Sequence, residues 1–158
     1  METVLDNALA MIDTDGKSMY DHQSSDGVDN KQEARMVFNA YRKIQSLGLE
    51  KSKIGIIAPY WAQVNAIKCL VDDDDVKVST VDGFQGGEKE VIIVSLTRSN
   101  RKKKIGFLND KRRMNVAITR GKRLTLLIGD SGTYSSVKEY KQLITYLKEQ
   151  GTLLKKSF

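Results

Sequence analysis

The stretch IGIIAPYWAQVNAIKCL, residues 54–70, carries the pattern that decides the fold. Its first five residues are apolar throughout, as in a strand that is buried on both faces of a parallel sheet. Pro59 follows where the first turn of a helix tolerates proline, and apolar residues then recur at helical spacing from Trp61 to Leu70. We therefore expect a buried strand and then a helix that packs Trp61 into the core beside Val64, the alternative role of Trp61 being a stacking platform.

The same alternation of apolar strands and amphipathic helices continues on both sides of this stretch. Such an alternation is typical of a parallel sheet that is covered by helices on both faces. We predict one α/β domain over residues 1–158, with no repeat or linker that would divide it. The expected strands span residues 8–12, 54–58, 76–81, 91–96 and 124–129, and the expected helices begin near Asn30, Pro59, Asp110 and Ser136.

Local signals mark the ends of several elements. Asn30 is expected to cap the first long helix, which Gly48 closes. Ser136 and Glu139 have the spacing of a capping box, which predicts that they begin the last helix. Residues 16–30 are polar and rich in Gly, Ser and Asp, which predicts a loop.

Composition excludes several classes of protein. Of the 158 residues, 40% are hydrophobic and 29% are charged, as in globular proteins. The apolar runs are far shorter than the ~20 residues that span a membrane. One cysteine, Cys69, and one histidine, His22, exclude a disulfide framework and a Cys/His zinc cluster. Because the acidic Glu2 and Asp6 are unlike the start of a secretory signal, we expect an intracellular protein, nuclear or cytoplasmic, with no membrane partner and no metal ligands.

Positive charge is concentrated in one segment of the chain. Residues 98–123 hold eleven Lys or Arg and one Asp, a net charge of +10. The remaining residues hold 15 basic and 19 acidic side chains, a net charge of −4. Such a segment indicates a polyanionic partner such as nucleic acid, although a solvated, solubilising face gives the same pattern.

The segment 82–88 supplies three glycines after an expected strand, at the edge where parallel sheets bind ligands. Glycines let the backbone approach a phosphate closely, although glycines between strands are also ordinary turn residues. Neither GxGxxG nor GxxxxGKS/T occurs anywhere in the sequence. The chain therefore contains no phosphate-cradling loop of its own.

Two longer stretches are more specific than any single loop. STVDGFQGGEKEVIIVSLTRSN (79–100) and IGFLNDKRRMNVAITRGK (105–122) resemble motifs V and VI of superfamily 1 helicases. IGIIAPYWAQV (54–64) resembles the strand-and-PY segment that precedes these motifs. The resemblance is closest to the superfamily 1B group of the nonsense-mediated-decay helicase and the immunoglobulin mu-binding-protein helicase. It leans toward the second through RSNRKKKIGFL (98–108) and GDSGTY (129–134).

The resemblance implies the second RecA-like domain, the C-terminal motor domain, of an ATP-dependent 5′–3′ helicase. In that family the first RecA-like domain carries the phosphate loop, and ATP with Mg²⁺ is clamped between the two domains. The implied partners are the N-terminal RecA-like domain of the same parent protein and a single strand of DNA or RNA. The isolated chain is expected to lack activity, because half of the catalytic site is absent.

Five residues match the nucleotide side of the two motifs. Arg120 matches the motif VI arginine, which implies an arginine finger that stabilises charge on the γ-phosphate. Its alternative role is a surface arginine that ends a helix. Glu88 matches the motif V glutamate that binds the ribose, or is a solvated charge. Gly86 matches a glycine that lets the backbone approach the nucleotide closely, or it belongs to a plain turn. Gln85 and Arg113 match residues that organise motif V against motif VI.

The nucleic-acid side of the family is matched by hydroxyl, aromatic and arginine side chains. Such groups contact the phosphates of a strand without reading its sequence. Tyr60 either stacks on a base or packs at the start of a helix, and residues 101–104 add attraction for a strand or only solubility. The matching residues are Pro59, Tyr60, Ser79, Thr80, Thr97 and Arg98.

The alternative to a motor domain is a non-catalytic nucleic-acid-binding module that uses the basic segment 98–123 alone. Arg120 and Glu88, in their motif context, favour the motor domain, because a pure binding module needs neither of them. DNA and RNA remain equally open as the natural substrate.

Overall fold

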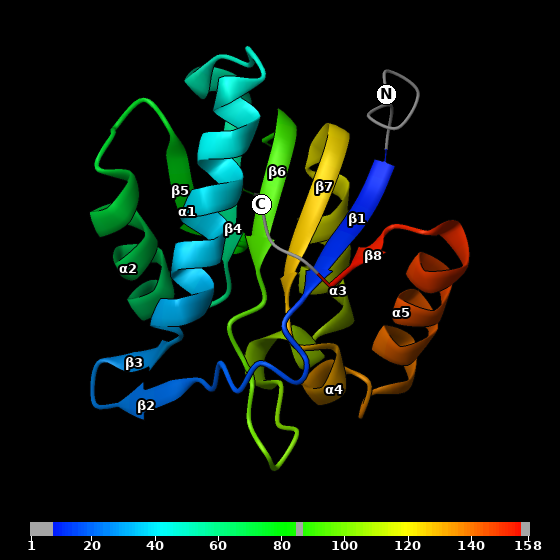
Figure 1. Ribbon diagram of the computed structural model, residues 1–158. Coiled ribbons are helices and arrows are strands. Elements are labelled where there is room, and N and C mark those ends of the chain that lie inside the picture. Colours follow the sequence, from blue (N-terminus) through cyan, green and yellow to red (C-terminus); the bar gives the residue numbers. More distant parts are fainter. Residues whose placement is uncertain (1–7, 85–86, 156–158) are drawn as a thin grey trace.

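A six-stranded sheet forms the centre of the protein (Figure 1). The computed structural model describes residues 8–84 and 87–155, and its sheet has the order β5-β4-β6-β7-β1-β8. Every neighbouring pair in this sheet is parallel, which confirms the predicted α/β class. The strands are β1 (Ala8–Asp13), β4 (Ile54–Ala58), β5 (Lys77–Thr80), β6 (Lys89–Ser95), β7 (Gly121–Gly129) and β8 (Leu153–Leu154).

Helices cover both faces of the sheet (Figure 1). On one face, Ile56 and Ile93 belong to a buried cluster with residues of α1 and α2. The neighbouring Ile57 and Ile92 point to the other face and belong to a cluster with residues of α3 and α5. The helices are α1 (Lys31–Ser46), α2 (Trp61–Val71), α3 (Lys111–Thr119) and α5 (Lys138–Gln150), with the short α4 (Ser131–Tyr134), η2 (Lys51–Lys53), η3 (Asp82–Phe84) and η4 (Gly106–Asn109).

One predicted helix cap is confirmed and the other is wrong. The Asn30 side chain accepts a hydrogen bond from the backbone N–H of Glu33 at 3.1 Å, as expected of an N-cap. At the last helix, α5, the N-cap is Val137, which makes no side-chain cap bond. The Ser136 hydroxyl instead donates to the carbonyl oxygens of Thr133 and Lys103. Ser136 therefore fastens a loop and does not form the capping box.

Two further predictions fail at exposed positions. Residues 16–30 contain an antiparallel hairpin of β2 (His22–Ser24) and β3 (Gly27–Asp29) where a loop was expected. Trp61 is 61% exposed, so its expected place in the core is wrong. Trp61 is the first residue of α2, where helical spacing from the buried Val64 does not determine whether the side chain is covered.

The two edges of the sheet have different surroundings. At the carboxyl edge, toward the bottom of Figure 1, the strands are followed by the β2–β3 hairpin, the loop 97–104 and α4. The amino edge carries the residues that precede β6 and β7. The segment 82–88 joins the two edges, because it begins after β5 and ends before β6. Only its start therefore lies at the carboxyl edge, and the buried Phe84 anchors it on the face of the sheet.

Candidate functional site

The strongest nucleotide candidates meet at the amino edge. Lys89 and Gly121 are paired across β6 and β7, so Glu88 and Arg120 precede neighbouring strands at matching positions. The Lys89 N–H donates to the carbonyl oxygen of Arg120 at 3.1 Å, and Nη1 of Arg120 donates to the carbonyl oxygen of Gly87 at 3.4 Å. The structure thus brings Gly87–Lys89 of motif V next to the end of motif VI. Gln85 and Gly86, also predicted for this side, lie outside the described residues.

The guanidinium of Arg120 is only partly satisfied. Its Nη2 donates to the Thr119 hydroxyl at 3.0 Å, but its Nε is buried and has no hydrogen-bond partner among the described residues. A buried donor without a partner costs about 1–3 kcal/mol. Glu88 is exposed. Both side chains thus retain hydrogen-bonding capacity that contacts within the described chain do not use.

Two lysines add positive charge to the amino edge, and the sequence motifs did not identify them. Lys77 begins β5, and its Nζ lies 4.3 Å from the centroid of the Phe84 ring. A Cβ on Gly87 would lie 3.7 Å from the same Nζ. Lys89 begins β6 and donates from its Nζ to the carbonyl oxygen of Ser52 at 2.8 Å. With Arg120, they form a cationic edge that suits a phosphate chain.

Glycine is required beside Arg120 by the local packing. A Cβ on Gly121 would lie 2.4 Å from the carbonyl oxygen of Leu124 and 2.6 Å from the Thr125 hydroxyl. That hydroxyl donates to the carbonyl oxygen of Ile118, in the last turn of α3. The close packing at Gly121 therefore helps to fix the backbone that presents Arg120.

Arg113 joins the two motifs at the opposite end of α3 from Arg120. Its Nη2 lies 3.4 Å from Oδ2 of Asp82, so an ion pair links motif VI to the start of the segment 82–88. Arg113 also lines a pocket at the carboxyl edge. The structure therefore separates Arg113 from the pair of Arg120 and Glu88 and groups it with nucleic-acid candidates.

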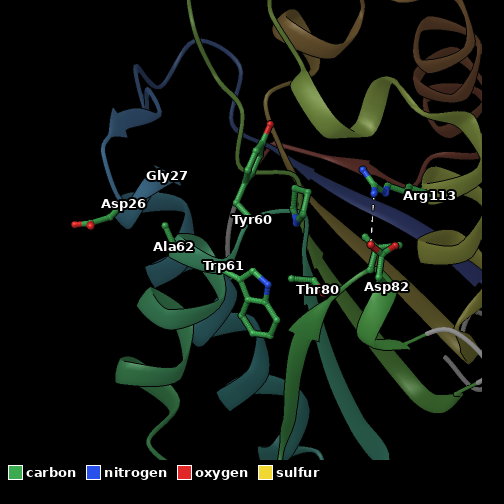
Figure 2. A pocket seen from close by; sticks show the side chains of 10 residues that line it. Asp26, Gly27, Tyr60, Trp61, Ala62, Thr80, Asp82 and Arg113 are labelled. Carbon is green, nitrogen blue, oxygen red and sulfur yellow. Dashed lines mark hydrogen bonds and ion pairs between the residues drawn. The ribbon is translucent and has the colours of Figure 1, made fainter.

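The carboxyl-edge pocket has a volume of about 380 Å³ and collects residues from several segments (Figure 2). Three of the predicted nucleic-acid residues line it, namely Pro59, Tyr60 and Thr80. Ser79 is half-buried beside Thr80 at the end of β5. The remaining lining residues are Asp26, Gly27, Trp61, Ala62, Val81, Asp82 and Arg113.

Arg98 is held by an acidic residue that the sequence patterns did not reveal. Arg98 is 8% exposed, and its Nε donates to Oδ2 of Asp21 at 3.0 Å. The same oxygen accepts from the backbone N–H of Ser99 at 2.9 Å. Burial alone would lower the pKa of Arg98, but hydrogen bonds with Tyr60 and Asp21 raise it above its ordinary value. Arg98 therefore stays charged and shapes the loop instead of projecting into solvent.

A glycine closes the contact between Arg98 and Tyr60. Nη1 of Arg98 lies 3.4 Å from the Tyr60 hydroxyl. Gly106 has a φ of +60°, and a Cβ there would lie 2.0 Å from the Tyr60 hydroxyl and 2.8 Å from Nη1 of Arg98. Only a glycine combines this left-handed backbone with so close an approach.

Thr97 is fully buried, so its side chain is not available to a strand in this structure. Its hydroxyl bonds to the carbonyl oxygen of Ser95 at 3.2 Å, and its φ is +71°, which is rare for a residue other than glycine. Its N–H donates to Oε1 of Glu33 at 2.6 Å. Thr97 therefore contributes through the shape that it gives to the loop 97–104.

Glu33 is the buried centre of this arrangement. Burial raises the pKa of Glu33 to about 8, against the opposing hydrogen bonds from Ser95 and Thr97. Its Oε2 is buried without a hydrogen-bond partner among the described residues. At neutral pH the carboxyl group is therefore mostly protonated, which spares the interior an uncompensated charge.

Gln63 extends the network to α2. Its side chain accepts from the backbone N–H of Asn30 at 2.8 Å and donates to the Asn30 carbonyl oxygen at 3.1 Å. It also donates to the hydroxyl of Ser95 at 3.0 Å. This network ties α1, α2 and β6 together, so it fixes the segment that carries Pro59 and Tyr60.

The basic run at residues 101–104 faces solvent. Asn100 closes its turn, because its side chain accepts from the N–H of Lys104 and donates to the carbonyl oxygen of the same residue, both at 2.9 Å. The guanidinium of Arg101 lies 5.7 Å from the centroid of the Tyr20 ring. The run is therefore an ordered, exposed positive surface at the carboxyl edge.

Within 8–84 and 87–155, no helix is long and apolar enough to cross a membrane. Over the same ranges, no three His, Cys, Asp or Glu side chains gather so that they could hold a metal ion.

Known proteins are similar to this chain in sequence. DNA polymerase alpha-associated DNA helicase A of Saccharomyces cerevisiae is 45% identical over 105 residues, which are 64% of this chain and 15% of that protein. DNA-binding protein SMUBP-2 of Mesocricetus auratus is 37% identical over 147 residues, which are 90% of this chain and 15% of that protein. The chain thus spans about a seventh of the length of these two relatives.

A solved structure shares the fold, and a protein-family model matches most of the chain. The C-terminal domain of a possible DNA helicase from Lactobacillus plantarum has a similar fold, with a TM-score of 0.51, 13% identity, and coverage of 80% of this chain and 74% of that one. The AAA domain family (AAA_12) matches residues 2–132. The chain therefore belongs to the AAA domain family, as a superfamily 1 helicase C-terminal motor domain close to the SMUBP-2 group.

Proposed function

We propose that this domain is the second motor half of an ATP-dependent helicase that moves 5′ to 3′ on single-stranded DNA or RNA. ATP with Mg²⁺ binds between the domain and a first RecA-like domain of the same protein. One observation carries the proposal: Arg120 and the loop of Glu88 are hydrogen-bonded together at the amino edge, apart from the carboxyl-edge pocket. A domain that only bound nucleic acid would need no such second site.

The amino edge suits a triphosphate that another domain holds. Lys77, Lys89 and Arg120 make it cationic, and Nε of Arg120 lacks a partner among the described residues. Bound ATP supplies the γ-phosphoryl group whose transfer to water drives movement. The Arg120 guanidinium stabilises negative charge there, and the Glu88 carboxylate accepts hydrogen bonds from ribose hydroxyls.

The carboxyl edge suits a single strand. Its exposed basic run at 101–104 attracts phosphates without reading the sequence. Pro59, Tyr60 and Thr80 line the neighbouring pocket, and Arg98 and Thr97 hold the loop between the pocket and the basic run. Strand binding and ATP binding therefore use opposite edges of one sheet, which lets a change at one edge be transmitted through β6 to the other.

The test is Arg120→Ala in the full-length helicase that carries this domain. Loss of an arginine finger costs about 10³–10⁵-fold in turnover, or roughly 4–7 kcal/mol of activation free energy. Strand affinity should stay near normal, because Arg120 lies at the other edge. Arg120→Lys should restore little, because an ammonium cannot reproduce the planar fork.

Arg123→Ala is the matched control. Arg123 lies at the same edge, three residues after Arg120 in β7, but it is exposed and paired with Glu90, Nε to Oε2 at 3.0 Å. Its loss should leave turnover near normal. If Arg120→Ala also kept near-normal turnover, the domain would instead be a non-catalytic nucleic-acid-binding module that uses residues 98–123.

A further inference from the structure

Trp61 is the single tryptophan of the chain, and most of its side chain faces solvent. It begins α2 directly after Pro59 and Tyr60 and is 61% exposed. Leaving so large an aromatic surface in water forfeits the free energy of its burial. The exposed indole in the pocket wall is therefore available to a ligand that covers it.

The surroundings of Trp61 form one side of the carboxyl-edge pocket (Figure 2). Its indole lies beside Thr80, and Tyr60 stands next to it on the same segment. Asp82 and Arg113 face it from another wall, joined by their ion pair. The pocket therefore combines a flat aromatic surface with polar groups at its margin.

Charge in the pocket favours a neutral ligand over a phosphate. Its charged lining residues are Asp26, Asp82 and Arg113, so the lining carries no net positive charge that would hold a phosphate. Arg113 already balances Asp82. At the carboxyl edge, the exposed basic run at 101–104 suits phosphates, and it does not line this pocket. A nucleobase is flat and uncharged, and it is linked to phosphates that this outer run can attract. An aromatic side chain of a partner protein has no such phosphates.

We propose that the indole of Trp61 stacks on a base of the bound single strand. The inference rests on the proposed function, because it assumes that the domain binds single strands. A stack uses the π-face that every base has, so it holds the strand without selecting its sequence. The pocket beyond Trp61 then accommodates the sugar or the neighbouring base.

The single tryptophan makes the stack directly observable. Trp61 fluorescence of the 158-residue chain should be quenched when oligothymidylate is added at low salt. An oligonucleotide of the same length with abasic sites should bind more weakly and should not quench. Trp61→Ala should weaken oligothymidylate binding by roughly 5- to 150-fold, the fold-change of one lost base–aromatic stack.

Two variants separate stacking from folding. Trp61→Phe keeps an aromatic face and should recover part of the lost affinity. Tyr146→Ala removes another exposed aromatic side chain, 51% exposed on α5, and should leave strand affinity unchanged. Far-ultraviolet circular dichroism should be the same for all three variants and the original chain, because both aromatic residues are mostly exposed.

The outcomes distinguish this inference from the function on which it rests. If the original chain bound no strand at low salt, the proposed function itself would fail. If it bound base-containing and abasic strands equally, with no quenching and no effect of Trp61→Ala, the stack would be refuted while strand binding stood. In that case Trp61 would belong to a protein interface.

Discussion

The carboxyl and amino edges of this sheet differ in how their predicted charged site residues are held. At the carboxyl edge, Asp21 pairs with Arg98, and the backbone of the strained Thr97 is bonded to Glu33. At the amino edge, Nε of Arg120 has no partner among the described residues, and Glu88 is exposed. Arg98 is thus paired within the chain, whereas Arg120 and Glu88 keep hydrogen-bonding capacity that the described residues do not use.

This difference agrees with the two proposed roles. A surface that binds a strand gains affinity when its loops are already ordered, because less conformational entropy is then lost on binding. A site divided between two domains can have its full set of partners only when the second domain closes over it. We therefore expect mutations at the carboxyl edge to affect folding and strand affinity, and mutations at the amino edge to affect turnover.

The largest expected effect on stability comes from breaking the Asp21–Arg98 pair. The Asp21 and Arg98 side chains are 4% and 10% exposed, so Asp21→Ala would leave an uncompensated charge in the interior. Such a loss costs about 3–5 kcal/mol. Urea unfolding of the chain measures it.

Asp73→Ala provides the matched control for this pair. Asp73 is bonded to Lys51 at 2.6 Å, but both side chains are more exposed, at 23% and 43%. Solvent screens such a pair, so its loss should change the free energy of unfolding far less. Equal losses in the two variants would contradict the claim that the carboxyl edge depends on a buried ion pair.

Glu33 should make stability fall as pH rises from about 4.5 to about 8. The pKa of Glu33 is raised in the folded protein to about 8 from an ordinary 4.5, so in this window the folded state holds a proton that the unfolded state has released. The stabilising contribution is complete below pH 4.5 and is lost as pH rises through 8, by at most about 1.4 kcal/mol per pH unit.

Glu33→Gln tests this origin of the pH dependence. Glutamine keeps an oxygen that accepts from Ser95 and Thr97 but cannot ionise. Urea unfolding at pH 5 and pH 8 should show a smaller difference in the variant than in the original chain. Asp13, whose pKa is lowered, titrates below this window and does not interfere. An unchanged difference would mean that other groups cause it.

Gly106→Ala should have a smaller effect that falls on both stability and strand affinity. A residue with a Cβ in the left-handed backbone conformation of Gly106 would lower the free energy of unfolding by roughly 1–2 kcal/mol. The new methyl group would also displace Tyr60 and Arg98. The matched control is Gly151→Ala. Gly151 has a similarly positive φ of +73°, but a Cβ there would have no atom within 4 Å, so this variant should lose stability and keep its strand affinity. Equal strand affinities in the two variants would contradict a role for the Tyr60–Arg98 contact.

The smallest effect on stability is expected from the basic run. Replacing residues 101–104 with glutamine should change the free energy of unfolding by about 0.5 kcal/mol or less, because these side chains are exposed. Strand affinity should fall, and its dependence on salt should become less steep by about 0.7 in the log–log slope for each lost phosphate contact. An unchanged salt slope would show that the run contacts no phosphate.

The sequence predicted the sheet well because its strands are apolar throughout. Ile54–Ala58 is buried at every residue, and such a run has no solvated face that could be confused with a surface helix. The β2–β3 hairpin was missed because all three residues of His22–Ser24 are exposed and polar, so no apolar pattern marks it. Ser136 was misassigned because its hydroxyl bonds to Lys103, 33 residues away, which no local pattern reports.

The sequence motifs predicted which residues of the two motifs meet in the candidate site. They did not predict which side chains are exposed, because tertiary contacts determine exposure. The meeting of Arg120 with the loop of Glu88 follows from the pairing of β6 with β7. The burial of Arg98 depends on Asp21, an isolated acid 77 residues away that no sequence pattern links to it. The exposure of Trp61 likewise depends on which elements reach the start of α2.

The central claim, that the amino edge is one half of a divided catalytic site, is tested most directly by ATP hydrolysis of the 158-residue chain alone. The assay should use a sample that binds oligothymidylate, so that inactivity cannot come from misfolding. With and without the strand, we expect hydrolysis equal to that of the buffer blank. Turnover comparable to that of an intact helicase, abolished by Arg120→Ala, would contradict the account, because the chain would then contain the whole site.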